Sequence, residues 1–575
     1  MAGMVRDRIA SLVTAALQQA QSTGDLPSVA LPEVTIDRPK VAEHGDYASN
    51  VAMRLQRATG GKPIEIAATI VKHLPADPAI GEASVAPPGF INFRLNEGWL
   101  ADQVTAMLEA GAGFADQMAS PPLKIQVEFV SANPTGPIHV GNGRGAAFGS
   151  TLANVLRAVG HEVETEYYVN DAGTQAEVFA RTLYVRYQQL FGRDVQVPEG
   201  GYPGEYMIEL AEAIKAQHGD RFLRPAGEPG PDELGTLGLE MMVEGIKADL
   251  GGLNVSYDVW FHERDLYDEG GDYDQTMALL RERGFVAERE GATWFTSTDL
   301  GEDKDNVLVR SGGSPTYFAS DIAYHRDKFI DRGFDRVIDI WGADHQGHVS
   351  RLKAGVDAIG GDPDHLRIIL YQLVTLKRGG EIVRLSKRAG DIITLREVVD
   401  EVGADACRFF FLLRSADSQM DFDIDLAKRQ SDENPVYRVQ YAHARIAGIL
   451  RTAAERGLTD EGGDVRLLTH PAELALIRKM LQLPELLDTI ARTYEPHHLP
   501  HYALDLASTF HGFYTEVRVV GHDPTTKEEV PEAVTRARLK LVAAAKITLA
   551  RVLGLMGMSA PDRMERVEVA ASVSG

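Results

Sequence analysis

The stretch "KIQVEFVSANPTGPIHVGNGRGAAFGSTLANVLRAVG" (124–160) decides the fold of this 575-residue chain. It predicts an apolar strand at 124–130, a turn rich in glycine and proline, and a helix at 143–160. The turn contains "HVGN" at 139–142. A helix N-terminus presents free backbone N–H groups to phosphate, and glycine lets a ligand approach the backbone. The stretch therefore predicts a phosphate site, although a helix-capping turn with an incidental histidine fits the tetrapeptide equally well.

The glycine spacing excludes two common nucleotide-binding motifs. Gly141, Gly143 and Gly145 form G-x-G-x-G, which differs from the G-x-G-x-x-G of dinucleotide-binding proteins. The phosphate-binding loop G-x-x-x-x-G-K-[ST] does not occur in the sequence. A dinucleotide oxidoreductase is therefore not predicted.

Strand patterns alternate with helical patterns up to about residue 420. Further strands are predicted from "EVETEYYV" (162–169), "RVIDIWG" (336–342) and "RIILYQLV" (367–374). Such alternation is typical of a parallel sheet with crossover helices. A polar excursion at about 188–300 interrupts the alternation and predicts an insertion.

The two ends of the chain have other patterns. Residues 44–60 predict a helix and residues 83–95 a strand entered through Pro-Pro-Gly, which together indicate a small α+β module. Residues from 435 onward have helical periodicity almost throughout, which predicts an α-helical bundle. We expect a multidomain α/β protein with an N-terminal α+β module at 1–115, a parallel-sheet domain at 116–434 and an all-α domain at 435–575.

The net charge of −24 is carried by the middle of the chain. Residues 1–115 have a net charge of −3, residues 116–434 one of −21, and residues 435–575 one of zero. An acidic centre favours a cationic small substrate, although a merely solvated surface explains the same charge. The neutral flanks leave room for local basic patches.

Cysteine content and hydropathy limit the setting of the protein. The single cysteine, Cys407, excludes an internal disulfide and a cysteine-cage metal site, which fits a reducing cytosol. The first twenty residues lack the apolar block of a signal peptide, and the most apolar late segment is broken by Lys546 and Arg551. We therefore expect a soluble intracellular protein.

The motif "PIHVGN" (137–142) resembles the HIGH signature of class I aminoacyl-tRNA synthetases, and the surrounding "VEFVSANPTGPIHVGNGRGAA" is similar to the form found in arginyl-tRNA synthetases. The second class I signature, KMSKS, has a counterpart in "RLSKR" (384–388), about 240 residues downstream. Further matches to the family span nearly the whole chain: "EYYVNDAGTQ" (166–175), "YPGEYMIELA" (202–211), "YFASDIAYHRDK" (317–328), "WGADHQGH" (341–348), "NPVYRVQYAHARI" (434–446) and "LGLMGMSAPDRM" (553–564).

Two residues depart from the family's signatures. Asn142 stands where the family usually has histidine, and Arg384 where it has the first lysine. Asparagine keeps a hydrogen-bond donor without a charge, and arginine keeps the charge but presents a planar fork. Lys387, the lysine usually held to matter most for catalysis, is present. The departures therefore concern how phosphate charge is shared and leave the reaction unchanged.

The resemblance implies a class I Rossmann-like catalytic domain and the reaction of an arginyl-tRNA synthetase. Arginine would react with ATP to give arginyl-adenylate and pyrophosphate, and the arginyl group would pass to the 3′ end of tRNA-Arg. The implied substrates are ATP with Mg²⁺, L-arginine and tRNA-Arg, without a tightly bound cofactor, a protein-bound metal or a membrane. A cytoplasmic monomer is implied, with the first module at the tRNA elbow and the helical domain at the anticodon.

The resemblance also assigns residues to these substrates. Expected in catalysis are His139, Asn142, Ser386 and Lys387, and expected at ATP are the same four with Pro137, Gly141, Gly143, Asp344 and Leu385. Expected at arginine are Asn133, Glu162, Tyr167, Tyr317, Asp321 and His345. Expected at tRNA are Tyr437, Arg438, Tyr441 and Arg445.

From the residues alone, these assignments have alternatives. Tyr317 and Asp321 are four apart in a helical pattern and share a face, but Asp321 could instead pair with Arg326. The tyrosines and arginines of the helical tail suit stacking on bases near phosphates, but buried tyrosines and solvated arginines fit equally. Two other protein classes stay open at this point: a small-molecule adenylyl- or cytidylyltransferase, and a non-catalytic tRNA-binding paralogue.

Overall fold

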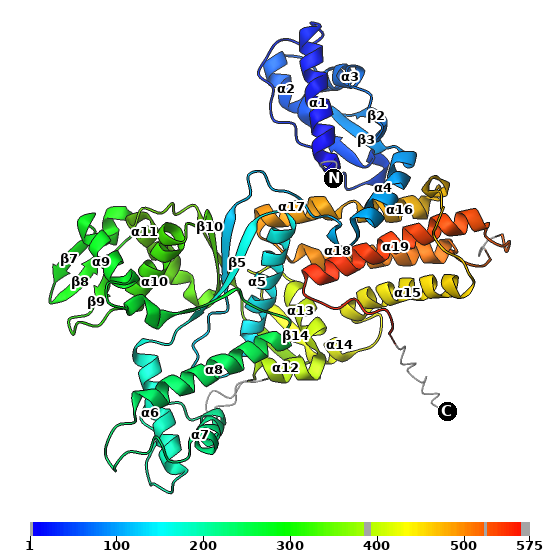
Figure 1. Ribbon diagram of the computed structural model, residues 1–575. Coiled ribbons are helices and arrows are strands. Elements are labelled where there is room, and N and C mark those ends of the chain that lie inside the picture. Colours follow the sequence, from blue (N-terminus) through cyan, green and yellow to red (C-terminus); the bar gives the residue numbers. More distant parts are fainter. Residues whose placement is uncertain (1–3, 384–392, 523–525, 565–575) are drawn as a thin grey trace.

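The computed structural model describes residues 4–383, 393–522 and 526–564. Its centre is a five-stranded parallel sheet in the order β11-β10-β4-β5-β6, which Figure 1 places between the N-terminal module and the parts of the chain inserted after β5. The strands are β4 (Lys124–Phe129), β5 (Glu162–Val169), β6 (Val259–His262), β10 (Arg336–Gly342) and β11 (Leu366–Tyr371). Since all neighbours are parallel, their carboxyl ends meet at one edge, where ligands bind in open α/β sheets.

The helix α5 (Val140–Ala158) connects β4 to β5 and packs on the sheet. Its side facing the sheet is made of small residues, and a Cβ placed on Gly149 would lie 2.3 Å from the Phe129 ring. Glycine at this position therefore lets the helix lie directly on β4. This close packing brings the start of α5 to the carboxyl edge of the sheet.

The excursion after β5 differs from the predicted insertion at 188–300. The chain forms three helices and then returns to the sheet as β6, which pairs with β5 in parallel register. The sequence did not reveal this strand because "VWFH" is four residues long and stands among polar residues. The helices, drawn below the sheet in Figure 1, are α6 (Gly173–Gln189), α7 (Glu205–His218) and α8 (Asp232–Gly252).

A small α+β unit lies between β6 and β10, on the left of Figure 1. Its antiparallel sheet β7-β8-β9 packs through Phe295 and Leu308 against the helix that carries Phe318 and Ile322. The elements are α9 (Asp272–Glu282), β7 (Val286–Arg289), β8 (Ala292–Phe295), β9 (Asn306–Val309), α10 (Tyr317–Arg326) and, after β10, α11 (Val349–Ala358).

The predicted strand at 367–374 is divided between two sheets. β11 ends at Tyr371, and the chain enters a second sheet in the order β13-β12-β14. Two strands of this sheet come before the stretch 384–392 in the sequence and one comes after it, and that stretch is outside the described residues. Its elements are β12 (Val374–Arg378), β13 (Glu381–Ile382), α12 (Leu395–Val402), α13 (Ala404–Leu412), β14 (Met420–Asp423) and α14 (Ile424–Lys428).

The N-terminal module is α+β, as predicted, but two of its elements differ from the prediction. Residues 44–60 form a short strand followed by a helix, and residues 83–95 are most of a hairpin rather than one strand. The module has the sheet order β1-β3-β2 with antiparallel pairs. Its elements are α1 (Val5–Ser22), β1 (Tyr47–Ser49), α2 (Val51–Thr59), α3 (Pro63–Lys72), β2 (Ile80–Ala86) and β3 (Phe90–Leu95).

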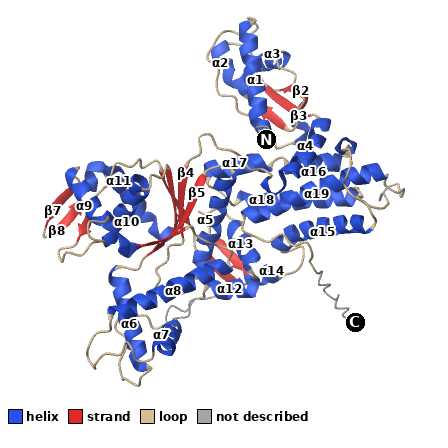
Figure 2. Ribbon diagram, in the orientation of Figure 1, coloured by secondary structure: helices blue, strands red, loops and turns tan. Residues whose placement is uncertain are grey.

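The C-terminal part is all-α, which confirms the predicted bundle (Figure 2). Its helices are α15 (Pro435–Glu455), α16 (Pro471–Met480), α17 (Leu483–Thr493), α18 (His498–Glu516) and α19 (Glu532–Leu555), and α4 (Glu97–Ala110) packs on α16 and α19. The N-terminal module is tied to this bundle by ion pairs, including Arg38 with Glu485 at 2.9 Å and Arg478 with Asp46 at 2.8 Å. None of the described helices is long and apolar enough to cross a membrane.

Candidate active site

The first turn of α5 is capped by a histidine. His139 is the N-cap, and its Nδ1 accepts a hydrogen bond from the Gly141 backbone N–H at 2.9 Å. Because Nδ1 is an acceptor, the imidazole proton lies on Nε2, which is left to donate to a ligand. Burial lowers the pKa of His139, so the ring stays neutral at pH 7. The capping turn left open by the sequence is therefore present, and the histidine is the cap.

The glycines of this turn serve helix packing. A Cβ on Gly143 would lie 2.7 Å from Leu395 Cδ1, and one on Gly145 would lie 2.9 Å from the Tyr371 ring. Gly143 is buried and its side-chain position faces the protein core, so the predicted contact with ATP is left to its backbone and stays a prediction. Gly141 is half-buried and meets only the His139 ring, so it is the glycine left for close approach by a nucleotide.

The histidine turn is hydrogen-bonded to the chain that follows the second signature. The Val140 N–H donates to the Ile393 carbonyl at 3.1 Å, and the Leu395 N–H donates to the Ile138 carbonyl at 2.8 Å. On the other side of the signature, the Val383 N–H donates to the Leu376 carbonyl at 2.9 Å. The predicted residues Leu385, Ser386 and Lys387 lie outside the described residues, between these two anchors. The histidine turn is thus joined by direct backbone hydrogen bonds to residues that follow the second signature in the sequence.

Two of the predicted ATP residues, Asn142 and Asp344, lie near Tyr371 at the carboxyl edge of the sheet. Burial and the Asp344 carboxylate raise its pKa to about 12, while a hydrogen bond with Asn142 opposes the rise. Asp344 is exposed in the turn that follows β10, and His345 lies beside it with 3.6 Å between Nε2 and Oδ2. The structure therefore brings Asn142, Asp344 and His345 to the same edge, and the half-buried Pro137 precedes the histidine turn.

Tyr317 and Asp321 share one face of α10, as their spacing predicts. The alternative pairing of Asp321 with Arg326 does not occur, because Arg326 donates to Asp331 at 2.7 Å and to Asp272 at 3.3 Å. No ion pair to Asp321 is found among the residues that the structure describes. Burial raises the pKa of Asp321 to about 6, and nearby Glu128 and Asp339 add to the rise. A carboxylate in this state attracts a cation from a ligand.

Glu263 is a second buried carboxyl that the sequence analysis did not select. It follows β6 directly, is 2% exposed, and its Oε2 has no hydrogen-bond partner among the described residues. Burial raises its pKa to about 7, and the Asp321 charge adds to the rise. Ser320, the neighbour of Asp321, hydrogen-bonds Glu263, so the two carboxyls lie close together. Its place after a parallel strand is the signal that identifies it, and that signal was lost with the unpredicted β6.

Two other predicted arginine residues lie near the carboxyl ends of β4 and β5. Tyr167 is fully buried, stacks on Trp260 at 4.4 Å and donates its hydroxyl hydrogen to the Ala132 carbonyl at 2.8 Å. Asn133 is exposed, and its side-chain amide donates to Gln175 at 2.6 Å. Tyr167 therefore fixes the turn that carries Asn133, and its hydroxyl is already engaged.

The prediction for Glu162 is wrong. This residue is exposed and begins β5, where it is paired in register with Lys124 at the start of β4. In a parallel sheet the amino ends of the strands lie at the edge opposite to the carboxyl ends, so Glu162 is on the opposite side of the sheet from His139 and Asp321. It cannot contact the guanidinium of an arginine bound at the carboxyl edge.

Three family models match the chain in succession. They describe the arginyl-tRNA synthetase N-terminal domain over residues 7–95, the class I (R) tRNA synthetase catalytic domain over residues 103–412, and the DALR anticodon-binding domain over residues 439–564. An arginine–tRNA ligase of Dehalococcoides mccartyi (strain CBDB1) is 51% identical over 560 residues, 97% of this chain and 99% of the relative. This chain belongs to the arginyl-tRNA synthetases.

Other relatives and solved structures agree. An arginine–tRNA ligase of Heliobacterium modesticaldum (strain ATCC 51547 / Ice1) is 48% identical over 567 residues, which cover 97% of this chain and 99% of the relative. The structure titled Thermus thermophilus arginyl-tRNA synthetase has the same fold, with a TM-score of 0.72, 24% identity and coverage of 98% and 100% of the two chains. As an arginyl-tRNA synthetase, this chain uses ATP to attach L-arginine to tRNA-Arg, which excludes the small-molecule nucleotidyltransferase and the non-catalytic paralogue.

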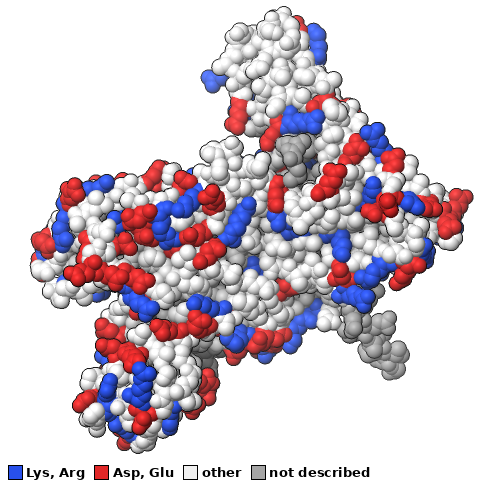
Figure 3. All heavy atoms as spheres, viewed as in Figure 1, with Lys and Arg blue, Asp and Glu red and all other residues white. Residues whose placement is uncertain are grey.

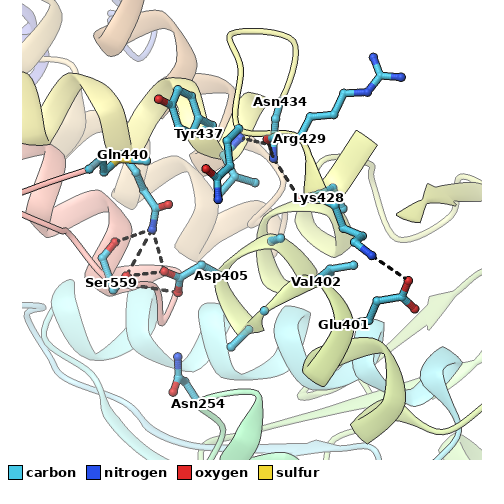
Figure 4. A pocket seen from close by; sticks show the side chains of 17 residues that line it. Asn254, Glu401, Val402, Asp405, Lys428, Arg429, Asn434, Tyr437, Gln440 and Ser559 are labelled. Atoms are coloured by element: carbon cyan, nitrogen blue, oxygen red, sulfur yellow. Dashed lines mark hydrogen bonds and ion pairs between the residues drawn. The ribbon is translucent and has the colours of Figure 1, made fainter. Parts of the chain in front are cut away.

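The residues of this synthetase predicted to contact tRNA all lie on α15 but have different surroundings. Tyr437 is 7% exposed and stacks on Tyr441 with 5.8 Å between ring centroids. It borders a cavity of about 790 Å³ in which Gln440 donates to Asp405 of α13 at 2.7 Å (Figure 4). Arg438 is exposed. The expectation that Tyr437 stacks on a base is corrected, because its ring is buried in the packing of the bundle.

Tyr441 and Arg445 line a different cavity, also of about 790 Å³. Arg445 donates to the Tyr514 hydroxyl at 2.9 Å, and its guanidinium lies 4.6 Å from the Tyr514 ring centroid. Arg518 lies 5.3 Å from the same ring. The cavity is also lined by Arg451 and Arg563, so it combines four arginines with two tyrosines. Such a basic and aromatic lining suits nucleic acid.

Charge is unevenly distributed over the synthetase. In the view of Figure 3, charged side chains of both signs cover the outlying parts at the left and the bottom, and the centre is mostly uncharged. Within the described part of the chain, one group of three carboxylates could hold a cation: Asp272, Asp327 and Asp331. Arg326 already donates to Asp272 and Asp331, so a guanidinium supplies positive charge there.

Proposed function

We propose that Asp321 and Glu263 select arginine in this synthetase by holding its guanidinium, with Tyr317 at the entrance. The observation that carries this proposal is the placement of two adjoining carboxyls that form no ion pair among the described residues, and burial raises their pKa values to about 6 and about 7. A guanidinium supplies two parallel N–H donors for such carboxylates. Neutral citrulline and the point charge of lysine would leave buried acceptors unpaired, so both are rejected without an editing site.

The nucleotide is held by the turn at the start of α5. His139 Nε2–H and the Asn142 side chain donate to the phosphates of ATP, which arrives with Mg²⁺. Lys387 precedes Ile393 by six residues, so its Cα lies within about 21 Å of that of Ile393 and can reach the same phosphates. Ser386 adds a hydroxyl, and Asp344, His345 and Asn133 lie around the adenosine and the amino-acid backbone.

These residues support the two steps of aminoacylation. The arginine carboxylate attacks the α-phosphorus of ATP, the bond to the β-phosphate oxygen breaks, and pyrophosphate leaves with the electron pair. A ribose hydroxyl of the tRNA 3′ end then attacks the activated carbonyl carbon, loses its proton, and AMP leaves. Neither step needs a protein nucleophile, so the enzyme acts by alignment and by stabilising charge on the departing phosphates.

The tRNA is proposed to lie along the bundle, with Tyr441, Arg445 and Tyr514 at the anticodon and Arg438 at the edge. The module at residues 1–115 would contact the tRNA elbow, where Phe90 is an exposed aromatic side chain. The catalytic part would extend over residues 116–434, with the helices α6, α7 and α8 inserted after β5, and the anticodon-binding part over residues 435–575. A cytoplasmic monomer fits this arrangement.

Replacing Asp321 by asparagine tests the arginine site. Asp321→Asn keeps the shape and removes the charge, and we expect it to raise the arginine KM about 100-fold, because losing one partner of a buried charged pair costs about 2–5 kcal/mol. The ATP KM should change less than about threefold. Steady-state charging of tRNA-Arg measures both constants.

The matched control is Asp331→Asn, which changes the same chemical group ten residues later in the chain, where it pairs with Arg326. This control should leave the arginine KM within about twofold of the parent enzyme. An equal rise of both KM values in Asp321→Asn would remove Asp321 from the guanidinium site.

A further inference from the structure

A histidine is buried one helical turn after Asp321. His325 is 3% exposed and joins α10 to the central strand β10. Its Nδ1 lies 2.7 Å from the Asp321 backbone carbonyl, and its Nε2 lies 2.9 Å from Asp339 Oδ2. Asp339 is fully buried in β10. The His325 ring is therefore hydrogen-bonded on one side to the backbone of Asp321, the proposed arginine-selecting residue, and on the other to Asp339 in the central sheet.

Both nitrogens of His325 face groups that accept hydrogen bonds. A backbone carbonyl has no hydrogen to donate, so Nδ1 must be the donor in that contact. Burial opposes ionisation of Asp339, but the charges of Lys328 and His325 outweigh it and lower the pKa of Asp339 to about 2. Asp339 is therefore an acceptor as well, and Nε2 must also carry a hydrogen. The partners on both sides thus require a doubly protonated imidazolium in the protein core.

A second buried cation holds the other oxygen of Asp339. Lys328 is 0% exposed, and its Nζ lies 3.0 Å from Asp339 Oδ1 and 2.6 Å from Glu128 Oε2 of β4. Its ammonium also lies 4.0 Å from the Tyr324 ring centroid. The chain thus fixes Asp339 from both sides, which leaves the His325 ring one orientation. Since His325 donates to the carbonyl of Asp321, this orientation is transmitted to the turn that carries the Asp321 side chain.

We propose that His325 is a buried imidazolium that positions Asp321 and keeps it ionised, so that it determines the affinity of this enzyme for arginine. The inference rests on the proposed role of Asp321. His325 is a positioning residue, because its ring acts through the Asp321 backbone and Asp339 and does not contact the substrate. Its charge acts through one helical turn, and its two hydrogen bonds hold α10 on β10 at the level of Asp321.

Several charged groups face Asp321 from the elements packed around it, and their effects are opposed. His325 on α10 and Arg351 on α11 lower its pKa, whereas burial, Glu128 on β4, Asp339 on β10 and the adjoining Glu263 favour the neutral form. Tyr168 on β5 and Tyr267 lie close by with raised pKa values of their own. Removal of the His325 charge therefore shifts the balance at Asp321 toward protonation.

The test is His325→Gln in the full-length enzyme, assayed by charging of tRNA-Arg. We expect the arginine KM to rise about tenfold with the ATP KM unchanged. We also expect the excess in arginine KM to shrink as pH is raised from about 7 to about 9, because the Asp321 carboxyl then ionises without help. Asp339→Asn removes the carboxylate that requires a hydrogen on His325 Nε2. This variant should also raise the arginine KM, by a smaller factor than His325→Gln.

His443→Gln is the matched control, because His443 is another buried histidine that contacts a backbone carbonyl, that of Pro561 at 2.9 Å, on α15. Its arginine KM should stay within about twofold of the parent. Equal changes of the arginine and ATP KM in His325→Gln, or an arginine KM unchanged at every pH, would overturn the proposal. If His325→Gln does not fold, Asp339→Asn decides by the same criteria.

The protonation state has a readout independent of activity. In enzyme labelled with ¹⁵N-histidine, the signal absent from His325→Gln, or displaced in Asp339→Asn, should have the shifts of an imidazolium. A neutral ring would overturn the inference. Failure of the proposed arginine site is distinguishable, because Asp321→Asn would then leave the arginine KM unchanged whatever the result for His325.

Discussion

The two halves of the active-site edge are proposed to bind ligands of opposite charge, and they present different chemical groups to them. The proposed arginine half, formed by the carboxyl ends of β5 and β6 with α10, must attract a cation and contains two carboxyls, Asp321 and Glu263, with raised pKa values. The proposed nucleotide half, formed by the first turn of α5 with Ile393–Leu395, must attract an anion and contains the neutral His139 and the Asn142 side chain.

This difference separates specificity from charge stabilisation. The backbone of Asp321 is held by a buried network of Lys328, His325 and Asp339, so this turn of α10 is positioned before the substrate arrives. The nucleotide half has one side fixed by backbone hydrogen bonds between the first turn of α5 and Ile393–Leu395, and the role proposed for Lys387 would add a cation there. Changes in the arginine half should therefore alter the arginine KM, and changes in the nucleotide half should alter kcat.

The largest effect is expected from Lys387→Ala. Loss of one preorganised donor to developing charge costs about 10²–10³ in rate by analogy with oxyanion-hole donors. The kcat for charging should fall by that factor while the arginine KM changes less than about threefold. The matched control is Lys377→Ala in β12, where the lysine pairs with Asp421 at 2.7 Å, and its kcat should stay within about twofold. A rise in arginine KM without a loss of kcat in Lys387→Ala would contradict the division between the halves.

The next largest effect is the pH dependence of the arginine half. Because the pKa values of Asp321 and Glu263 are about 6 and about 7, both carboxyls gain protons as the pH falls through this range. A protonated carboxyl has no charge for the guanidinium, so the arginine KM at saturating ATP should rise as pH falls, by up to about tenfold per unit below each pKa. Asp321→Asn should flatten part of this profile. An arginine KM that is constant between about pH 5.5 and 8 would show that these carboxyls do not bind the guanidinium.

A smaller effect is expected from Gly143→Ala, which tests how the nucleotide half is built. The new Cβ would lie 2.7 Å from Leu395 Cδ1 and 2.9 Å from the Phe411 ring. Overpacking of this kind costs about 1–3 kcal/mol of unfolding free energy, partly offset by about 1 kcal/mol of helix propensity. Gly245→Ala in α8 is the control, because no atom lies within 4 Å of its added Cβ, so it should stabilise the protein. Thermal unfolding measures both, and equal melting temperatures would contradict the packing role.

The sequence was sufficient for those parts of the fold whose pattern is long. β5 and β10 have the predicted bounds of 162–169 and 336–342, since β5 alternates glutamate with β-branched and aromatic residues and β10 is mostly apolar. β6 was not predicted, because four residues give no usable periodicity. The helix predicted at 143–160 begins at Val140 instead, since the histidine side chain replaces the serine, threonine, aspartate or asparagine that usually marks a cap.

The candidate site was predictable only where a motif names it. Glu162 was wrong because a resemblance gives the residue type but not the edge of the sheet, although a strand beginning at Glu162 places it at the amino edge. Glu263 lies in no motif, and His325 lies in the family match at 317–328 without a role assigned to it, so both were found through burial, an unpaired oxygen and the partners of each ring nitrogen. Such properties depend on contacts between segments far apart in sequence.

The smallest effect is expected at the tRNA surface, which is outside both halves. Arg445→Ala removes one cation from the cavity of Tyr441 and Tyr514, and the tRNA KM should rise by about three- to tenfold, with a weaker dependence on salt because one phosphate contact is lost. The kcat and the arginine KM should not change. Arg281→Ala in α9 removes the same charge from an exposed position on the small α+β unit and should leave the tRNA KM unaltered. Arg438 is exposed on α15, next to the buried Tyr437. Arg438→Ala should therefore raise the tRNA KM more than Arg281→Ala does and less than Arg445→Ala does. A larger effect for Arg438→Ala than for Arg445→Ala would move the anticodon from this cavity to the one bordered by Gln440.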